Sequence, residues 1–300
     1  MKRLFQACLG VLLAAVLLSA CRQDDTWTDL LDPELSQWRV YQSYALTDDF
    51  VPWQRPKDSL GVEIPPIGYD VNMDNEFRVE MLDGEPVLHI TGQYYGCVFT
   101  RESYGNYRLR LKVKFGEDKF EPRLDKARDS GLLYHSTGEC GQDGWVSWMR
   151  SHEFQIIESG TREGSCGDYY NMLGTHMDIH AVPRMESPVW SMYSYDPEAP
   201  LRTMGISGGG ATCGGQDLTN PDAEWISLEL ICFEDKALHI VDGKVKMVLQ
   251  NSAWWDGEKD IPLTEGRIQL QSEAAEVFYK DIEICRITTL PDEYAEYFAK

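Results

Sequence analysis

The sequence predicts an all-β protein, built as a two-sheet antiparallel sandwich or jelly roll, and three observations lead to this prediction. Residues 107–115 alternate apolar and basic side chains without a break, which is the two-residue period of a strand with one buried face. Two segments, 77–92 and 238–249, each carry an Asp-Gly pair between apolar runs, at residues 83–84 and 242–243, and such pairs favour tight hairpins. Helical periodicity is almost absent.

Further segments also predict strands, and loops rich in Gly, Pro, Asp and Asn separate them: Ser130 to Ser136, His152 to Ser159, Trp225 to Phe233, Arg267 to Ser272 and Val277 to Ile287. A parallel sheet would need crossover helices between its strands, and the chain has almost no helical pattern. Many short antiparallel strands therefore predict two packed sheets.

The first 21 residues have the pattern of a bacterial lipoprotein signal. Residues 1–3 are basic, residues 9–18 are apolar but too few to span a bilayer, and Leu18-Ser19-Ala20-Cys21 is a small-residue cleavage site ending in cysteine. We therefore expect Cys21 to be lipidated as the first residue of the mature chain. The alternative is an ordinary cleaved signal with an incidental cysteine.

Residues 22–33 predict a short tether behind this cysteine. Its first four residues, Arg22-Gln23-Asp24-Asp25, resemble the surface-export signal of Bacteroidetes lipoproteins. The expected location is the outer membrane, with the folded part facing the periplasm or the cell surface.

Residues 34–300 are expected to form one domain, because no low-complexity linker or fixed-period repeat divides them. The formal net charge of −21 argues against nucleic acid or an anionic membrane surface as a partner, since both would repel the chain. Membrane contact is therefore expected only through the lipid, and a neutral sugar suits the charge. No nucleotide-binding glycine fingerprint follows a predicted strand, so the chain is not expected to oxidise sugars itself.

The cysteines beyond Cys21 do not have the spacing of a metal site. Cys140, Cys166 and Cys213 lie in Gly-rich loops and could form disulfides. Cys97, Cys232 and Cys285 alternate with apolar residues and are expected to be buried thiols. The pairing remains open.

Several segments, taken in order, resemble the 3-keto-disaccharide hydrolase family, formerly a domain of unknown function. The longest, Gly266 to Ile284 (GRIQLQSEAAEVFYKDIEI), resembles the closing strands of that domain. Four upstream segments support it: Asp129 to His135 (DSGLLYH), Trp148 to Gln155 (WMRSHEFQ), Gly167 to Tyr170 (GDYY) and Glu224 to Leu230 (EWISLEL). The resemblance covers roughly Glu34 to Thr289 and implies a concanavalin A-like jelly roll. Loops 117–126 and 206–220 do not share it.

The resemblance also implies a chemistry, which is cleavage of a glycoside whose carbon-3 hydroxyl an upstream sugar 3-dehydrogenase has oxidised to a ketone. The ketone acidifies the hydrogen on carbon 2, so a base can remove it, the bond from carbon 1 to the leaving oxygen then breaks, and water adds afterwards. Such a site needs a base, a group that stabilises the enolate and an acid for the leaving group. A divalent metal ion is one option for the stabilising group.

The segment from Ser151 to Glu158 is the richest candidate for this chemistry. On a strand, Glu153 and Gln155 point to one face while Phe154 and Ile156 point to the other. A polar pair facing a sandwich is costly unless it is hydrogen-bonded or lines a cleft. We therefore predict Glu153 as catalytic and Gln155 as substrate-binding, with an edge strand whose polar face lies in water as the alternative.

Glu158 is a further catalytic candidate, although a regular strand places it opposite Glu153 and only a bulge would unite the two carboxylates. The run EFQIIE also resembles the Glu-x-Asp-x-x-Glu strand of laminarinases and lichenases, which use two carboxylates. Gln155 stands where that motif has aspartate. A retaining β-glucanase is thus one alternative function, and a non-catalytic carbohydrate-binding surface lipoprotein is another.

His135 is a second candidate for a base or metal ligand, although a lone histidine is more often structural. His176, Asp178 and His180 would share one face of a strand, a spacing that could hold a divalent cation but suits an exposed strand equally well. Whether a metal is needed stays open.

Several residues near Glu153 are candidates for binding a sugar. Arg150 and Asp168 could hydrogen-bond its hydroxyls, with surface ion pairing as the alternative. Aromatic residues make up 11% of the chain, and most should be core. The aromatic candidates for stacking are those expected in polar loops, together with one strand tyrosine: Trp145, Trp148, Tyr169, Tyr170 and Tyr134.

Overall fold

The computed structural model describes residues 26–142, 146–161, 163–187, 189–205 and 209–298. The predicted lipidation site, Cys21, lies outside these residues. The strands are β1 (Thr28–Asp29), β2 (Trp38–Ala45), β3 (Gly68–Tyr69), β4 (Phe77–Leu82), β5 (Glu85–Ile90), β6 (Tyr94–Thr100), β7 (Tyr107–Lys119), β8 (Asp129–Thr137), β9 (Arg150–Ile157), β10 (Tyr169–Met172), β11 (Thr175–Met185), β12 (Trp190–Tyr195), β13 (Leu201–Met204), β14 (Gly210–Gly214), β15 (Ile226–Phe233), β16 (Lys236–Val241), β17 (Lys244–Trp255), β18 (Asp260–Pro262), β19 (Arg267–Ser272) and β20 (Ala275–Arg286).

Helices are few and short in this part of the chain: η1 (Met73–Asn75), η3 (Asp292–Tyr294) and α1 (Ala295–Phe298). None of the described helices is long and apolar enough to cross a bilayer.

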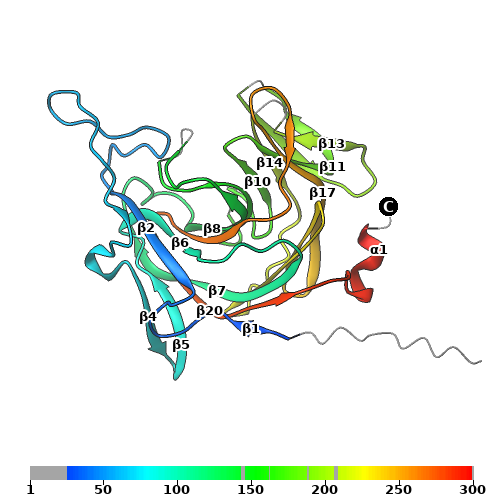
Figure 1. Cartoon of the computed structure of the whole chain (residues 1–300), viewed down its shortest axis with the longest axis horizontal. Coiled ribbons are helices and arrows are strands. Elements are labelled where there is room, and N and C mark those ends of the chain that lie inside the picture. Colours follow the sequence, from blue (N-terminus) through cyan, green and yellow to red (C-terminus); the bar gives the residue numbers. More distant parts are fainter. Residues whose placement is uncertain (1–25, 143–145, 162, 188, 206–208, 299–300) are drawn as a thin grey trace, which may run out of the picture.

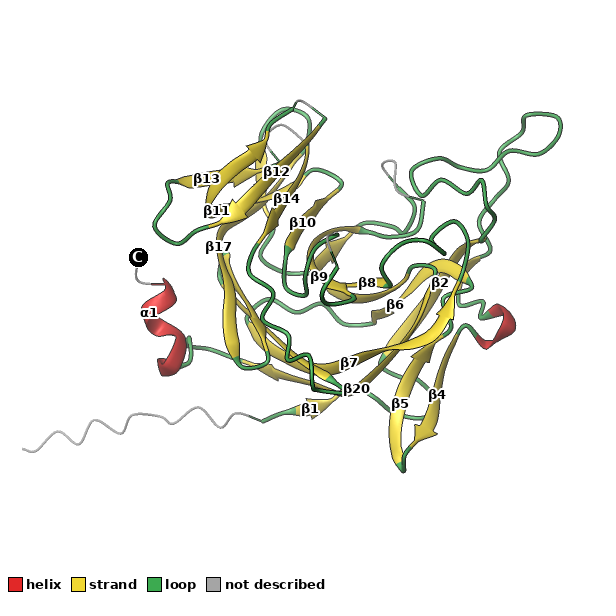
Figure 2. Cartoon of the chain, turned by 180° about the vertical axis from the view of Figure 1, so that it is seen from behind, coloured by secondary structure: helices red, strands yellow, loops and turns green. Residues whose placement is uncertain are grey.

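The strands form two layers, as the sequence predicts. The front sheet has the order β3-β2-β6-β19-β8-β9-β10-β14-β12-β11. The back sheet has the order β4-β5-β20-β7-β15-β16-β17, and β1 pairs with β20. Figures 1 and 2 show β6 and β8 of the front sheet lying over β7 and β20 of the back sheet. The predicted all-β, two-sheet jelly roll of concanavalin A-like type is confirmed.

Two details of the pairing go beyond a simple antiparallel sandwich. β12 and β14 are parallel, whereas the other pairs in these two orders are antiparallel. β11 also pairs with β13 and β17, and β17 with β18, so the two sheets join along one edge.

The two predicted hairpins are confirmed, each with a two-residue turn. Leu82 pairs with Glu85 and Val241 pairs with Lys244, so the Asp-Gly pairs alone make the connections. The turn residues have positive φ, 53° and 88° at residues 83–84 and 46° and 72° at residues 242–243. Asp and Gly tolerate these angles, which match the twist of the flanking strands.

The main core lies between the sheets. Phe154 and Ile156 of β9 face it from the front sheet, and Leu109 and Leu111 of β7 face it from the back sheet. The predicted alternation of β9 is therefore confirmed, since Glu153 and Gln155 must point to the opposite, outer face of the front sheet.

Part of that outer face carries a second apolar cluster. Tyr95 and Cys97 of β6 pack there against Phe50 and Trp148, which come from the segments that follow β2 and precede β9. These segments touch each other, because Val146 donates to the carbonyl oxygen of Pro52 (3.0 Å). The cluster covers one end of the outer face and leaves the Glu153 region beside it as a recess.

Part of the segment predicted as a tether, residues 22–33, contacts the sandwich. Thr28 and Asp29 pair with β20, and the Leu30 amide donates to the carbonyl oxygen of Ile282 (2.8 Å) while its side chain is fully buried. The segment that follows Asp29 is therefore part of the sandwich, although the sequence places the domain boundary at residue 34.

All six cysteines that the structure describes are buried thiols. The prediction is thus confirmed for Cys97, Cys232 and Cys285. The three cysteines that the sequence assigned to loops are unpaired as well, and Cys140 lies closest to another, with its Sγ 3.9 Å from that of Cys97.

Candidate active site

Four strands or turns of the front sheet bring polar side chains together on its outer face. Glu153 lies on β9, Gln271 on β19 and Asp129 at the start of β8, while Glu273 follows β19 and Arg123 comes from the loop before β8. These residues line a cavity of about 240 Å³. Sites that enclose a drug-sized ligand measure roughly 300–1,000 Å³, so this cavity suits a single sugar ring.

One arginine joins two of the three carboxylates. Arg123 donates to the carboxylate of Asp129, and its second amino group lies 3.3 Å from Glu273 Oε1. Burial acts to lower the pKa of Arg123, but the charges of Glu273 and Asp129 outweigh that effect and raise it. Arg123 therefore stays charged and fixes the spacing of the two acids.

Glu153 has no ion pair with a basic residue among those that the structure describes. Its side chain is 4% exposed. Burial raises the pKa of Glu153 well above its usual range, and the charges of Glu273 and Asp129 raise it further, while Arg123 and Gln271 oppose the rise. A raised pKa brings a carboxyl closer to the range in which a general base or acid works.

The other two carboxyl groups also bind protons more tightly than free ones. Burial and then the charge of Glu273 raise the pKa of Asp129 well above its usual range, and Arg123 opposes this. Burial likewise raises the pKa of Glu273. Ionising all three of these carboxyls beside one guanidinium is costly, so the cluster is suited to supply both a proton donor and a proton acceptor.

Aromatic and apolar side chains complete the cavity. Tyr170 and Trp190 line it with ring centroids 6.2 Å apart, and Trp148 and Ile157 also contribute. Trp190 is partly exposed, unlike Trp148, whose side chain is 1% exposed. A sugar ring could therefore stack at the Trp190 side of the cavity.

The sequence-predicted residues Glu153 and Gln155 both lie in this cavity. Tyr170, one of the predicted aromatic residues, lies there too. The catalytic and binding roles of these residues remain predictions.

Glu158 does not join Glu153. It follows the end of β9, and its carboxylate accepts from the Arg128 guanidinium (2.7 Å) and the Arg128 amide (3.1 Å). Its side chain lies in a separate depression beside Glu117. The bulge that would unite Glu153 and Glu158 is absent from β9, whose pairing with β8 is regular over residues 152–157.

His135 lies on the other side of β8, between the sheets. Its Nδ1 donates to the carbonyl oxygen of Leu263 (3.0 Å), and its ring lies 6.5 Å from that of His152. Burial lowers the pKa of His135 to about 4. The structure therefore separates His135 from the Glu153 cavity, and the predicted base at this position is not supported.

Two aromatic residues predicted to bind the sugar lie in the core, and one of them, Tyr169, was expected in a polar loop. Tyr134 and Tyr169 are fully buried, with Tyr134 Oη 3.1 Å from His239 Nε2 and Tyr169 Oη 2.9 Å from His152 Nδ1. Neither can stack on a sugar without unpacking the sandwich. Trp148 only borders the cavity, because its indole donates to the carbonyl oxygen of Gly96 (2.9 Å) beneath the covering segments. Trp145 lies outside the described residues.

Arg150 and Asp168 make protein contacts away from Glu153. Arg150 donates to the carbonyl oxygen of Leu173 (2.9 Å), with its guanidinium 4.0 Å from the ring centroid of Trp254. Asp168 forms a buried ion pair with Lys246 (2.9 Å) and also accepts from the amide of Gly215 (2.9 Å). The structure therefore does not place these two side chains beside Glu153, and their predicted role in binding substrate stays untested.

The predicted metal-ligand triad does not assemble. His176 lies 3.4 Å from Asp260, Asp178 accepts from Thr203 (2.6 Å), and His180 contacts the carbonyl oxygen of Ala199 (2.6 Å). A β-bulge between His176 and Asp178 breaks the alternation on which the prediction depended. Within the described ranges, no group of three or more His, Cys, Asp or Glu side chains is placed to hold a metal ion.

The sequence analysis did not select eight residues that line the cavity: Arg123, Asp129, Ile157, Glu163, Met172, Trp190, Gln271 and Glu273. Gln269 and Gln271 are two apart on β19 and so share a face, which is the same pattern that selected Glu153 and Gln155. Asp129 is the first residue of β8 and Glu273 lies beyond the end of β19, so alternation does not single them out. Arg123 and Trp190 lie in segments without a periodic signal.

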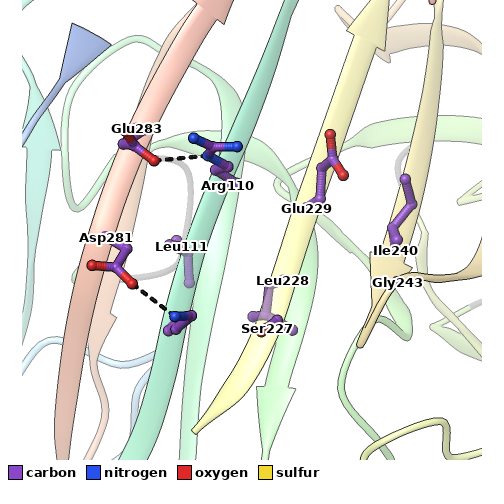
Figure 3. A pocket seen from close by; sticks show the side chains of 10 residues that line it. Arg110, Leu111, Ser227, Leu228, Glu229, Ile240, Gly243, Asp281 and Glu283 are labelled. Atoms are coloured by element: carbon purple, nitrogen blue, oxygen red, sulfur yellow. Dashed lines mark hydrogen bonds and ion pairs between the residues drawn. The ribbon is translucent and has the colours of Figure 1, made fainter. Parts of the chain in front are cut away.

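A second hollow, of about 430 Å³, lies on the outer face of the back sheet and is shown in Figure 3. Its charges already pair with one another: Arg110 with Glu283 (2.7 Å) and Lys112 with Asp281 (2.9 Å). It offers no unpaired carboxyl comparable to Glu153, so the front-sheet cavity is the better candidate for catalysis.

Comparison with known proteins points to a family that acts on glycosides. A family model described as a 3-keto-alpha-glucoside-1,2-lyase-like domain matches residues 26–285. No curated protein matches the chain. Among solved structures, a candidate glycosyl hydrolase from Parabacteroides distasonis is 15% identical, with 87% of this chain and 94% of that chain covered and a TM-score of 0.44. LamAcat from Zobellia galactanivorans is 12% identical, with 85% and 92% covered and a TM-score of 0.41.

Proposed function

Because this chain belongs to the 3-keto-α-glucoside-1,2-lyase-like family, which acts on glycosides, we propose that it cleaves glycosides already oxidised at carbon 3. The single observation that carries the proposal is the environment of Glu153. This carboxyl is buried in the cavity, has a raised pKa and has no basic partner in the described chain.

The proposed reaction begins with Glu153 as the base. Its carboxylate takes the proton from carbon 2, and the electron pair of that C–H bond moves toward the ketone to form an enolate. The enolate then expels the oxygen on carbon 1, which leaves a double bond between carbons 1 and 2. Addition of water to carbon 1 completes net hydrolysis, and without it the reaction is a lyase step.

A second carboxyl of the cluster would protonate the leaving oxygen. Asp129 and Glu273 both have raised pKa values, so either binds a proton more tightly than a free carboxyl does. Arg123 forms ion pairs with both Asp129 and Glu273, so it keeps one carboxyl oriented while the other reacts. Its positive charge also offsets the negative charge that develops on the sugar.

A retaining β-glucanase is the second candidate, and the presence of several carboxyls in one cavity favours it. A retaining mechanism needs a nucleophile and an acid on opposite sides of the scissile bond. Glu158 cannot be the second group, but Asp129 or Glu273 could be. A non-catalytic carbohydrate-binding protein would need the aromatic wall of Tyr170 and Trp190 but not Glu153.

We also propose the setting of this reaction from the N-terminal sequence. Lipidation at Cys21 would anchor the protein to the outer membrane, facing the periplasm or the cell surface. A sugar 3-dehydrogenase would supply the ketone, because the cavity offers a carboxyl base but no nucleotide-binding motif occurs in the chain. Mass spectrometry of the purified mature N-terminus tests the lipid.

The test of the function uses the soluble chain lacking residues 1–21 and two matched substrates. 4-Nitrophenyl 3-keto-α-glucoside and 4-nitrophenyl α-glucoside differ only at carbon 3, and release of 4-nitrophenol reports cleavage of either. We expect release from the keto sugar alone, with loss of release in Glu153→Gln. Parallel reactions with a chelator decide whether a divalent metal is needed.

The other outcomes select the rival functions. Cleavage of the unoxidised glucoside, or of a β-glucan, would favour the glucanase. Binding without cleavage of any of these substrates would favour the carbohydrate-binding protein.

A further inference from the structure

Gln271 is the polar side chain of the cavity whose hydrogen bonding is least satisfied. It lies on β19 and is fully buried, yet neither its amide nitrogen nor its amide oxygen makes a hydrogen bond of good geometry among the described residues. The amide lies close enough to Glu153 to help lower the pKa of that carboxyl, so the proposed base is its polar neighbour. Buried amides normally find partners, so one that does not, in the wall of a cavity, points to a bound ligand.

Gln269 is a useful comparison, because its buried amide is hydrogen-bonded within the protein. It lies two residues earlier on the same strand, on the same face, and is also fully buried. Its Nε2 donates to Ser136 Oγ (2.8 Å), and its Oε1 accepts from the amide of Met149 (3.2 Å). The two glutamines thus differ in their partners, not in their burial.

The unsatisfied amide lies next to the proposed base. A Cβ placed on Gly131 would fall 2.3 Å from Gln271 Oε1 and 2.3 Å from Glu153 Oε1. The polar ends of both side chains therefore lie next to the same glycine. A ligand atom that reacts with Glu153 would therefore have Gln271 as its neighbour.

A primary amide presents one donor and one acceptor side by side. An α-hydroxy ketone is the complement, since its carbonyl oxygen only accepts and the adjacent hydroxyl can donate. We propose that Gln271 recognises the oxidised part of the sugar, with Nε2 donating to the oxygen on carbon 3 and Oε1 accepting from a neighbouring hydroxyl. This inference rests on the proposed function and names the residue that selects the ketone.

The same contact would assist the reaction. As the proton leaves carbon 2, negative charge develops on the oxygen of carbon 3, and a donor aimed at that oxygen binds it more tightly than in the ground state. Gln271 would therefore contribute to turnover as well as to selection of the keto sugar.

The test compares Gln271→Met with Gln269→Met, because methionine has a similar length and no amide. We expect Gln271→Met to lower kcat/KM for 4-nitrophenyl 3-keto-α-glucoside by roughly 100-fold, without a fall in Tm. Gln269→Met should lower Tm, since it removes an amide that forms hydrogen bonds in the folded protein. It should keep kcat/KM within about threefold when measured on folded protein.

Binding is measured separately in a Glu153→Gln background by titration calorimetry with the keto glucoside and with its parent. Adding Gln271→Met should weaken binding of the keto sugar and remove the preference over the parent. An unchanged preference in the Gln271→Met background would overturn the inference while leaving the proposed function intact. If the wild-type chain cleaves no keto sugar and shows no preference for binding it, both proposals fail.

Discussion

Gly131 of β8 lies directly beneath the carboxyl end of Glu153 on β9, and a Cβ at position 131 would come within 2.3 Å of Glu153 Oε1. The absence of a side chain at this position creates the floor of the cavity. The two residues belong to adjacent strands, since Gly131 pairs with Gln155 and Leu133 with Glu153.

Gly131→Ala should therefore reduce activity strongly and stability little. The atoms that meet the new methyl group are the flexible ends of Glu153 and Gln271, which can move, and no positive φ is recorded at Gly131 that would strain an alanine. We expect kcat/KM to fall roughly 10²-fold or more, because a misplacement of about 1 Å can cost that much. The measurement is turnover of the keto glucoside together with thermal unfolding.

Gly116→Ala is the matched control. Gly116 also lies in a strand, β7, and its new Cβ would meet the end of a glutamate, Glu276 Oε2, at 2.0 Å. That glutamate lies outside the cavity, so activity should be unchanged. Equal losses of activity in both variants would show that any such displacement disturbs the protein and would remove the special role of Gly131.

Glu153→Gln should abolish activity and raise stability at neutral pH. The folded pKa of Glu153 is raised, mainly by burial, so its contribution to stability is fully present below the unfolded value of about 4.5 and is lost as pH rises through the folded value. Above that value the wild type holds a charge that burial disfavours, and the variant does not. We expect a Tm higher by about 2–6 °C at pH 8 and no difference near pH 4.

Glu158→Gln supplies the contrast, because it removes a glutamate from the same sequence motif. Its ion pair with Arg128 is partly exposed and should be worth at most about 1 kcal/mol. Activity should stay within twofold of wild type. A large loss of turnover in Glu158→Gln would restore the two-glutamate mechanism of the glucanases.

The front-sheet strand that carries Glu153 could be predicted well from sequence, whereas its chemical partners could not. The alternation of Glu153, Phe154, Gln155 and Ile156 depends only on local backbone geometry, and the structure keeps it. Asp129 and Glu273 join Glu153 through strand pairing and through Arg123, which comes from a loop. Contacts between distant segments leave no periodic signal in a single sequence.

The site residues that the structure places away from Glu153 were also misjudged because of contacts between distant segments. Asp168 and Tyr169 follow glycine-rich sequence and look like loop residues. In the structure, however, Asp168 forms an ion pair with Lys246 of β17, and Tyr169 forms a hydrogen bond with His152 of β9. His176 and Asp178 are separated by a bulge that alternation cannot foresee. In each case a tertiary partner decides the exposure of the side chain.

The buried histidines predict a loss of stability in acid. Burial lowers the pKa of His135 to about 4 and that of His239 to about 3, whereas both would titrate near 6.5 when unfolded. As pH falls below 6.5 the unfolded chain takes up protons that the folded chain does not, so stability decreases until the folded values are reached. Each imidazole can contribute up to about 1.4 kcal/mol per pH unit.

His135→Asn tests this contribution, because asparagine tolerates the positive φ of 50° at this position and can still donate to Leu263. The difference in unfolding free energy between wild type and variant, measured by denaturant titration at pH 7, 6, 5 and 4.5, should shift in favour of the variant as pH falls. Turnover should be retained. A folded but inactive His135→Asn protein would instead support the predicted base at this position.

Glu76 should act as a positioning residue for Glu273. Glu76 is fully buried, and its carboxylate contacts Ser272 Oγ (2.7 Å) and accepts from the amide of Gly92 (2.8 Å), which fixes the segment between β19 and β20. Glu273 is the next residue in that segment. Glu76→Gln replaces one acceptor oxygen with an NH2 group that faces these donors, so the segment and Glu273 should move.

We expect Glu76→Gln to lower Tm by about 5–10 °C and kcat roughly 10-fold, and to shift the pH dependence of kcat/KM. The shift follows because, after burial, the charge of Glu273 contributes most to raising the pKa of Glu153, so moving Glu273 away lowers that pKa and the rate should rise at a lower pH. Asp168→Asn is the control, since it breaks a buried ion pair with Lys246 away from the cavity. It should destabilise the protein without moving the pH profile. If neither variant changes the pH dependence of kcat/KM, Glu76 contributes only to stability. The position of Glu273 that Glu76 fixes through Ser272 would then have no effect on the pKa of Glu153.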